Sequence, residues 1–100
     1  MSQDLEKIFQ ALGNKTRLDI VKLILAKKEI SCQGIMQNFN LSQPTMSHHF
    51  SQLIDTDIIK VRKVGVSHVY SLNRQLLERN GIYFKKAKST ESDLVDEAIQ

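Results

Sequence analysis

The sequence predicts a mainly helical α+β fold of the winged helix-turn-helix type, with about five helices and a two-stranded wing. Three observations predict it. Apolar residues at helical spacing fill the first half of the 100-residue chain, and two of these helices are separated by a turn of about three residues. Two strand-like runs follow, with Gly65 between them, and basic residues gather over 59–88. Two short helices across a tight turn form a helix-turn-helix, and the hairpin behind them would be its wing.

The first two helices are predicted from apolar spacing and from the residues at their ends. The face of the first helix is formed by residues at i, i+3, i+4 and i+7, which are Leu5, Ile8, Phe9 and Leu12. Gly13 ends this helix. Asn14 then caps a second helix, which is expected to end at about Lys27 and Lys28. Because the second helix carries apolar residues on nearly every side, we expect it to be central and packed on several neighbours.

The third and fourth helices each follow a serine that can cap them. The third helix begins at Ser31, and Asn40 takes the left-handed conformation that stops it. Ser42 caps the fourth helix, where Pro44 is tolerated in the first turn. The turn between these helices is therefore expected at about residues 40–42. The apolar stripes are Cys32, Ile35, Met36 and Phe39 in the third helix, and Met46, Phe50, Leu53 and Ile54 in the fourth.

The second half of the chain predicts a hairpin and one further helix. The strands are expected over 58–64 and 66–72, with Gly65 supplying the turn. Asn73 caps a fifth helix, in which Asn80 and Gly81 predict a kink or an early stop. The apolar residues of this helix are Leu76, Leu77, Tyr83 and Phe84. We interpret 1–100 as a single domain, whose last residues, about 89–100, form either an acidic tail or a short extra helix.

The outward face of the predicted fourth helix is covered with short or planar hydrogen-bonding groups. At roughly 100° per residue, this face comprises Pro44, Thr45, Ser47, His48, Ser51 and Gln52. It has no aliphatic side chain and no formal charge, whereas an ordinary solvated helix face carries Lys and Glu. Base edges in the major groove of DNA pair with such groups. The alternative is a polar helix of a protein-interaction domain, and the basic hairpin argues against it.

The basic residues of the predicted wing indicate contact with phosphates. Eight of the 14 Lys and Arg residues lie within 59–88, together with a single acid. Lys60, Arg62 and Lys63 belong to the first strand and His68 to the second. Since strands alternate faces, Arg62 and Lys63 point to opposite sides, yet both can reach phosphates that flank a groove. Such contacts set affinity and register without reading sequence. The alternative is a hairpin edge kept soluble by charge.

The composition narrows the functional class. No apolar run approaches the roughly 18 residues of a membrane span, and the acidic N-terminal start does not predict a signal peptide. The single cysteine, Cys32, excludes an internal disulfide and fits a reducing cytoplasm. The core of so small a domain is marginal, which favours a dimer. No phosphate-binding glycine motif and no evident nucleophile–base set is present, so an enzyme is not expected.

Three segments resemble one known family. Residues 41–50 (LSQPTMSHHF) closely resemble the recognition helix of the ArsR family of repressors. Residues 11–20 (ALGNKTRLDI) resemble the opening of that family's second helix, and 68–72 (HVYSL) are similar to the end of its wing. The resemblance covers about residues 5–85 in order. It implies a cytoplasmic repressor of transcription, a homodimer built from the first and fifth helices, which binds double-stranded DNA at an operator of approximate dyad symmetry.

The resemblance also implies which residues contact DNA. In the groove these are Gln43, Thr45, Ser47, His48, His49 and Gln52, and from the wing they are Arg62, Lys63 and His68. His49 lies beside the buried face of its helix, so packing against the core is an equal alternative for this residue.

Many members of that family sense metals, and here the sequence departs from them. Two thiolates with one residue between them bind metal in the third helix of those members, but Ser31 and Gln33 stand at these positions and Cys32 stands between them. The other usual set takes Asp and His from the fifth helix, and residues 73–100 contain no histidine. We therefore expect no metal and no cofactor, and the effector stays unknown. The rival hypotheses are a metal- or redox-responsive repressor and a winged-helix protein-interaction module.

Overall fold

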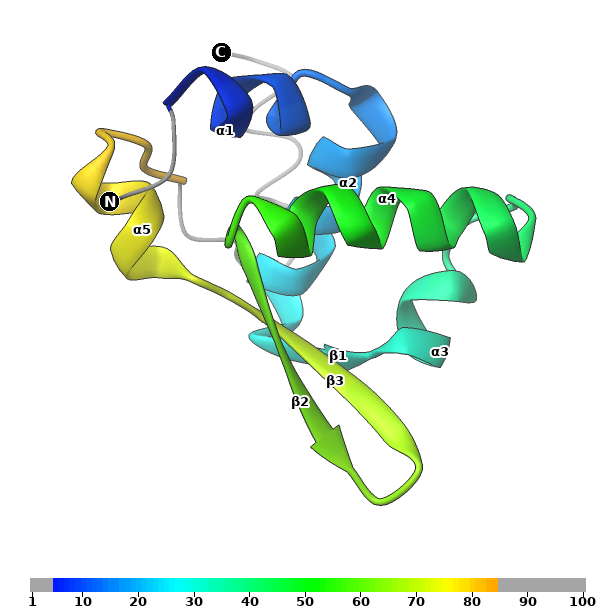
Figure 1. Cartoon of the computed structure of the whole chain (residues 1–100). Coiled ribbons are helices and arrows are strands. Elements are labelled where there is room, and N and C mark those ends of the chain that lie inside the picture. Colours follow the sequence, from blue (N-terminus) through cyan, green and yellow to red (C-terminus); the bar gives the residue numbers. More distant parts are fainter. Residues whose placement is uncertain (1–4, 85–100) are drawn as a thin grey trace, which may run out of the picture.

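A computed structural model describes residues 5–84 of the chain. Within this range five helices and three strands follow one another, with the winged helix-turn-helix arrangement that the sequence predicts (Figure 1). Their order is α1 (Leu5–Leu12), α2 (Lys15–Lys27), β1 (Glu29–Ser31), α3 (Cys32–Met36), α4 (Gln43–Asp55), β2 (Ile59–Val64), β3 (Ser67–Leu72) and α5 (Arg74–Arg79). No helix in the described part of the chain combines the length and the apolar character that crossing a membrane requires.

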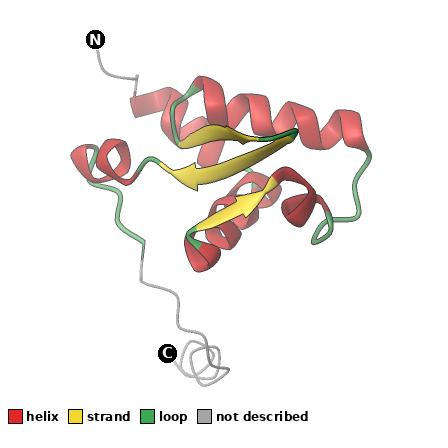
Figure 2. Cartoon of the chain, turned by 90° about the horizontal axis from the view of Figure 1, so that it is seen from below, coloured by secondary structure: helices red, strands yellow, loops and turns green. Residues whose placement is uncertain are grey.

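Helix α2 occupies the centre of the core, as its apolar residues predict. Ile20, Val21 and Ile24 are fully buried, and α2 contacts α1, α4, β1 and β3. Seen from below, the strands lie between helices on two sides (Figure 2). The buried apolar residues of the core are Ile8, Ala11, Ile20, Val21, Ile24, Ile35, Met46, Phe50, Leu53, Ile58, Ile59, Tyr70, Leu76 and Leu77.

Side-chain caps start four of the helices, and all four are the residues that the sequence predicts. Asn14 accepts a hydrogen bond from the backbone N–H of Arg17 at 3.0 Å. Ser31, Ser42 and Asn73 each accept from the N–H three residues ahead. Each such cap contributes about 1 kcal/mol to stability. The caps fix where α2, α3, α4 and α5 begin.

The sheet has one strand more than the predicted two-stranded wing. It is antiparallel in the order β1-β3-β2, with Ile30 opposite Tyr70 and Val61 also opposite Tyr70. A strand of three residues is too short to show an alternating pattern, so β1 left no signal in the sequence. The hairpin lies where the sequence predicts it, but each strand begins one residue later, at Ile59 and Ser67. Gly65 opens the turn with a φ of 62° and Val66, which was expected in the second strand, completes it. A positive φ at the first turn residue alone is typical of a type II′ turn.

The third helix ends earlier than predicted. It stops at Met36, because the N–H groups of Asn38 and Phe39 bond to carbonyls three residues back instead of four. The side chain of Asn38 also donates to the carbonyl of Gly34 at 2.8 Å, which competes with helix continuation. Asn40 does not have a positive φ, so its predicted left-handed stop is wrong. The connection to α4 therefore covers residues 37–42 instead of about 40–42.

Helix α5 stops early at its Asn–Gly pair, which is one of the two predicted outcomes. Gly81 has a φ of 76°. The N–H of Ile82 donates to the carbonyl of Leu77 at 2.8 Å, and that of Gly81 to Glu78 at 3.0 Å. These two bonds form a Schellman motif, which satisfies the last carbonyls of a helix. Tyr83 therefore lies beyond the helix in which it was expected, as does Phe84. The predicted tail or helix at 89–100 lies outside the described residues.

Candidate nucleic-acid interface

Helix α4 divides into a buried face and an exposed face. Met46, His49, Phe50 and Leu53 are buried. The opposite side, which we call the outward face of α4, consists of Gln43, Pro44, Thr45, Ser47, His48, Ser51 and Gln52, all exposed except the half-buried Gln52. Five of the six helix residues that were expected to contact DNA thus share one accessible surface, and His49 does not.

The beginning of α4 is free of negative charge. The Ser42 hydroxyl accepts the N–H of Thr45 at 3.3 Å and donates to the Thr45 hydroxyl at 2.9 Å. This leaves the Thr45 hydroxyl hydrogen available to a further acceptor. No acid lies in the first turn, so the partial positive charge of the helix N-terminus is not neutralised there. The outward face of α4 thus offers neutral donors and acceptors in a setting that does not repel a polyanion.

His49 has a different position from the one expected of a DNA contact. Its side chain is 8% exposed, and its Nδ1 lies 3.2 Å from Nη1 of Arg17 on α2. Burial lowers the pKa of His49, and its electrostatic interactions with Arg17 and His48 lower it further. A buried histidine that contacts Arg17 is not available to base edges, so His49 takes the packing alternative instead of a place among the groove residues.

The wing presents its basic residues on both faces of the hairpin. Lys63 lies opposite His68, on the same face as Val61 and Tyr70. Arg62 lies on the other face, and its Nη2 forms an ion pair with Oε1 of Glu29 at 2.8 Å. Within residues 5–84, Lys60 and Lys63 have no such acidic partner. The two wing cations that the sequence analysis treated alike are therefore unequal. Lys63 has no acidic partner among the described residues, whereas Glu29 partly compensates the charge of Arg62.

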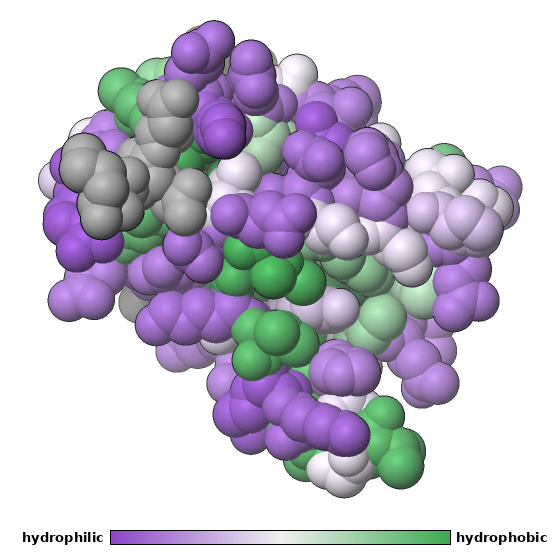
Figure 3. Space-filling model, in the orientation of Figure 1, coloured by the Kyte–Doolittle hydropathy of each residue, from purple (hydrophilic) through white to green (hydrophobic). Residues whose placement is uncertain are grey.

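Apolar side chains at the tip of the wing are a feature that the sequence did not reveal. Val66 is 97% exposed, and Val61 and Val64 are also exposed. Hydrophobic and hydrophilic groups lie side by side on the projecting hairpin (Figure 3). These valines match the apolar pattern of a strand, so sequence reasoning assigned them to the sheet.

The N-terminal end of α4 and the tip of the wing extend toward the same side of the molecule (Figures 1 and 2).

The start of α3, where the family resemblance pointed to possible metal ligands, holds other chemistry in this chain. Ser31 caps α3, and Cys32 is half-buried against Tyr70. Burial and the neighbouring thiol raise the pKa of Tyr70 to about 12. Among the described residues, no group of three or more His, Cys, Asp or Glu side chains converges in a way that could hold a metal ion. Ser31 and Cys32 are thus occupied with capping and packing.

Comparisons with known proteins agree with this geometry. Residues 14–61 match the model of a family described as "Bacterial regulatory protein, arsR family". The chain is 34% identical to the arsenical resistance operon repressor of Staphylococcus xylosus over 76 residues, which cover 76% of this chain and 72% of the relative. It is 31% identical to the transcriptional repressor SdpR of Bacillus subtilis, with 74% and 81% covered.

Solved structures show the same fold. An ArsR-like transcriptional regulator from Rhodococcus sp. RHA1 superposes with a TM-score of 0.68 at 20% identity, covering 95% of this chain and 82% of that one. Reduced HlyU from Vibrio cholerae superposes with a TM-score of 0.64 at 23% identity, covering 77% and 81%.

Proposed function

The chain belongs to the ArsR family of bacterial regulatory proteins and is a DNA-binding transcriptional repressor, and from this premise we propose how it recognises its operator. A homodimer binds double-stranded DNA of approximate dyad symmetry in the cytoplasm. Each subunit is a single domain that places α4 in the major groove and its wing along the flanking backbone. Two-fold symmetry in the protein requires matching half-sites in the DNA.

The observation that carries this proposal is the chemistry of the outward face of α4. Apart from Pro44, its side chains are hydrogen-bonding groups with accessible surface, and none of them is a carboxylate, lysine or arginine. Gln52 has the two-pronged amide that pairs with adenine, and Ser47 and Thr45 can bond to several bases. His48, on the same face, and Gln43, in the first turn, complete the groove contacts. A partner-binding helix would instead gain from apolar anchors, which this face lacks.

The wing supplies the contacts that hold the DNA without reading it. Lys63 and His68 form a cross-strand pair, and Lys60 adds a further cation on the same strand. Arg62 contributes less than Lys63, because Glu29 competes with phosphate for its guanidinium. This division of labour follows the general rule that phosphate contacts position a protein, whereas base contacts specify the sequence.

The dimer is proposed to form on the face that contains α1. Phe9 is 54% exposed and Leu5 42% exposed, which leaves apolar surface on α1. Tyr83, just beyond α5, is exposed as well. The resemblance places the fifth helix in the dimer interface, which would include its apolar residue Leu77. However, Leu77 is 2% exposed within a single chain and belongs to the core. Phe9→Glu should therefore yield folded monomers in sedimentation velocity, and a dimer of unchanged stability would place the interface elsewhere.

The proposal is tested by selecting duplexes from a random-sequence library with the purified protein. We expect a dyad-symmetric consensus that binds at least about a hundredfold tighter than a scrambled duplex of the same composition. We expect one dimer per duplex. Recovery of sequences without symmetry, or of none at all, would contradict the proposed mode of binding.

A further inference from the structure

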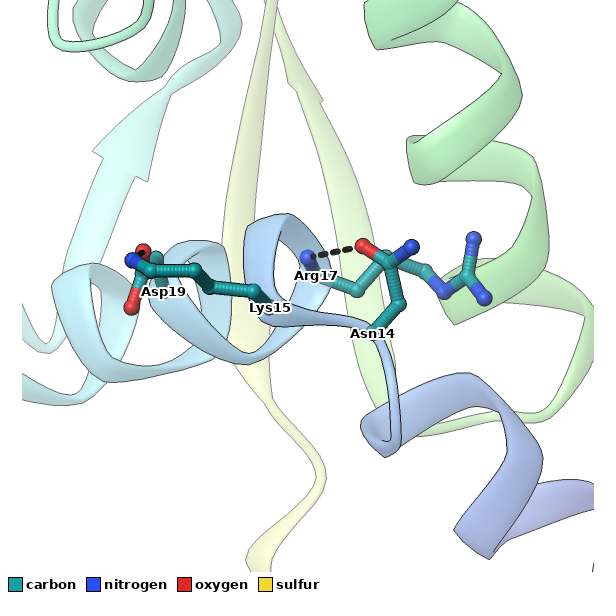
Figure 4. Close-up of polar contacts among 4 residues, drawn as sticks. All are labelled: Asn14, Lys15, Arg17 and Asp19. Atoms are coloured by element: carbon teal, nitrogen blue, oxygen red, sulfur yellow. Dashed lines mark hydrogen bonds and ion pairs between the residues drawn. The ribbon is translucent and has the colours of Figure 1, made fainter.

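One polar contact links α1, α2 and the buried side of α4. Arg17, in the first turn of α2, donates from Nε to the carbonyl oxygen of Ala11 at 2.8 Å. Its Nη1 lies 3.2 Å from Nδ1 of His49. The Arg17 side chain runs toward α4, whereas Lys15 on the same turn points the other way and pairs with Asp19 (Figure 4). One guanidinium therefore bridges the end of α1 and the middle of α4.

The chemistry of this contact fixes the state of His49. A guanidinium has donors and no acceptor, so Nδ1 of His49 must accept the hydrogen bond. The ring is then neutral and carries its proton on Nε2. The carbonyl of Ala11 belongs to the last turn of α1, where helix carbonyls have no partner within the helix. Arg17 thus satisfies a free carbonyl on one side and sets the tautomer and ring orientation of a buried histidine on the other.

His49 lies next to the outward face of α4. His48, the preceding residue, belongs to that face, and the imidazole centroids of His48 and His49 are 5.9 Å apart. Any rotation of α4 about its axis would move His49 away from Arg17 and would turn the outward face by the same angle. Hydrogen bonds to base edges weaken steeply when donor and acceptor are misaligned.

We propose that Arg17 is a positioning residue for DNA recognition, which through His49 holds α4 at one orientation relative to α1. The inference rests on the proposed reading of DNA by the outward face of α4. Since α1 also carries the exposed apolar residues of the proposed dimer face, Arg17 connects the element that spaces the two subunits with the element that reads each half-site. Loss of this contact should therefore reduce discrimination between sequences more than it reduces binding to DNA in general.

The first test compares Arg17→Met with Lys15→Met. Both variants remove one positive charge from the first turn of α2, but only the first removes the contact with α4. Fluorescence anisotropy would be measured on the duplex selected from the library and on its scrambled counterpart. We expect Arg17→Met to lose about tenfold or more on the selected duplex, the loss typical of one good base contact, and to bind scrambled DNA much as before. Equal losses on both duplexes would overturn the proposal, as would an equal effect of Lys15→Met.

A second pair of variants keeps the test valid if Arg17→Met does not fold. His49→Leu fills the buried site without an acceptor, and His49→Asn places an amide oxygen close to the position of Nδ1. The leucine variant should lose discrimination, and the asparagine variant should restore most of it. Full discrimination in the leucine variant, or the same loss in both variants, would show that the contact does not position α4.

The pH dependence gives a readout that packing alone would not change. Within the described residues, Arg17 from α2 and His48 from α4 are the charged or titratable groups that act on His49. Both favour its neutral form, and burial lowers its pKa below the ordinary value as well. Discrimination should hold at neutral pH and be lost only as the pH falls through the lowered pKa of His49, below the ordinary histidine range, because a protonated Nδ1 cannot accept from Arg17.

His49→Asn should lack this pH response. His48 and His68 remain in that variant, so the difference between the two profiles isolates His49. Nitrogen-15 NMR of the wild-type ring should show the proton on Nε2 at neutral pH. A proton on Nδ1 would contradict the proposal whether or not DNA is present.

Ser47→Ala, measured in parallel, separates this inference from the proposed function. If Ser47→Ala lowers discrimination and Arg17→Met does not, the outward face of α4 reads DNA and the positioning role of Arg17 is wrong. If neither variant affects discrimination, both the proposed function of α4 and the inference built on it are wrong.

Discussion

The outward face of α4 and the wing are both accessible, but they are built in opposite ways. Helix α4 is anchored, since its other face lies in the core, Ser42 caps its start and Arg17 reaches it from α2. The wing projects away from the core, and every residue from Lys60 to His68 is exposed. Its cations sit on long side chains, and its tip ends in Val66.

This difference separates two demands of DNA recognition. Hydrogen bonds to base edges require donors and acceptors at defined distances and angles, which only an anchored helix provides. Attraction between a lysine and a phosphate falls slowly with distance and tolerates several geometries. The anchored face of α4 therefore suits hydrogen bonds to base edges, and the projecting charged hairpin suits contacts with phosphates.

The largest expected contrast is in stability. Leu53→Ala removes a fully buried side chain on the core side of α4 and should lower the free energy of unfolding by about 2–5 kcal/mol. Val66→Ala, at the tip of the wing, should change it by less than about 0.5 kcal/mol. Urea denaturation followed by circular dichroism measures both. A comparable loss in Val66→Ala would show that the wing is part of the cooperative core.

The next contrast is in sequence reading. Gln52→Ala and Ser47→Ala should each weaken binding to the selected operator by about 1–3 kcal/mol and leave scrambled DNA nearly unaffected. The reason is that both side chains belong to the outward face of α4 and carry no charge. Titrations with each duplex at fixed salt measure the effect. Equal weakening on both duplexes would remove α4 from the role of the reading element.

A smaller effect is expected from the wing. Lys63→Ala should weaken operator and scrambled DNA alike, and should reduce the slope of log affinity against log salt by about one per lost phosphate contact, hence about two per dimer. Arg62→Ala is the matched control on the same strand, and its effect should be smaller because Glu29 already pairs with Arg62. A larger slope change in Arg62→Ala would show that DNA displaces this ion pair.

No effect is expected from metals. Zn²⁺, Cd²⁺ or arsenite at micromolar concentration should leave operator affinity unchanged, because Ser31 and Gln33 cannot replace thiolate ligands. A cavity of about 220 Å³ lies between the start of α3 and the wing, lined by Ser31, Cys32, Gln33, Val66, Ser67 and His68. A tenfold loss of affinity with stoichiometric metal would show that this region senses ions. The wing would then take part in sensing as well as in phosphate contact.

Much of the candidate site could be predicted from the sequence because its signals are local. The outward face of α4 follows from helical periodicity, its start from Ser42, and the hairpin from alternating residues around Gly65. The position of His49 was less certain, because a residue at the border of a helical stripe can lie on either side. Only its neighbours in space determine which side it takes.

The sequence by itself determined the helix caps, the early stop of α5 at Asn80 and Gly81, and the neutral character of the outward face of α4. Each of these depends on groups within a few residues of one another, where chain geometry alone brings donor and acceptor together. Tertiary structure alone decided the pairing of β1 with β3, the ion pair between Glu29 and Arg62, and the contact between Arg17 and His49. The last two join residues 33 and 32 positions apart. No periodicity in the chain spans such distances, and the contacts exist because packing around α2 brings those segments side by side.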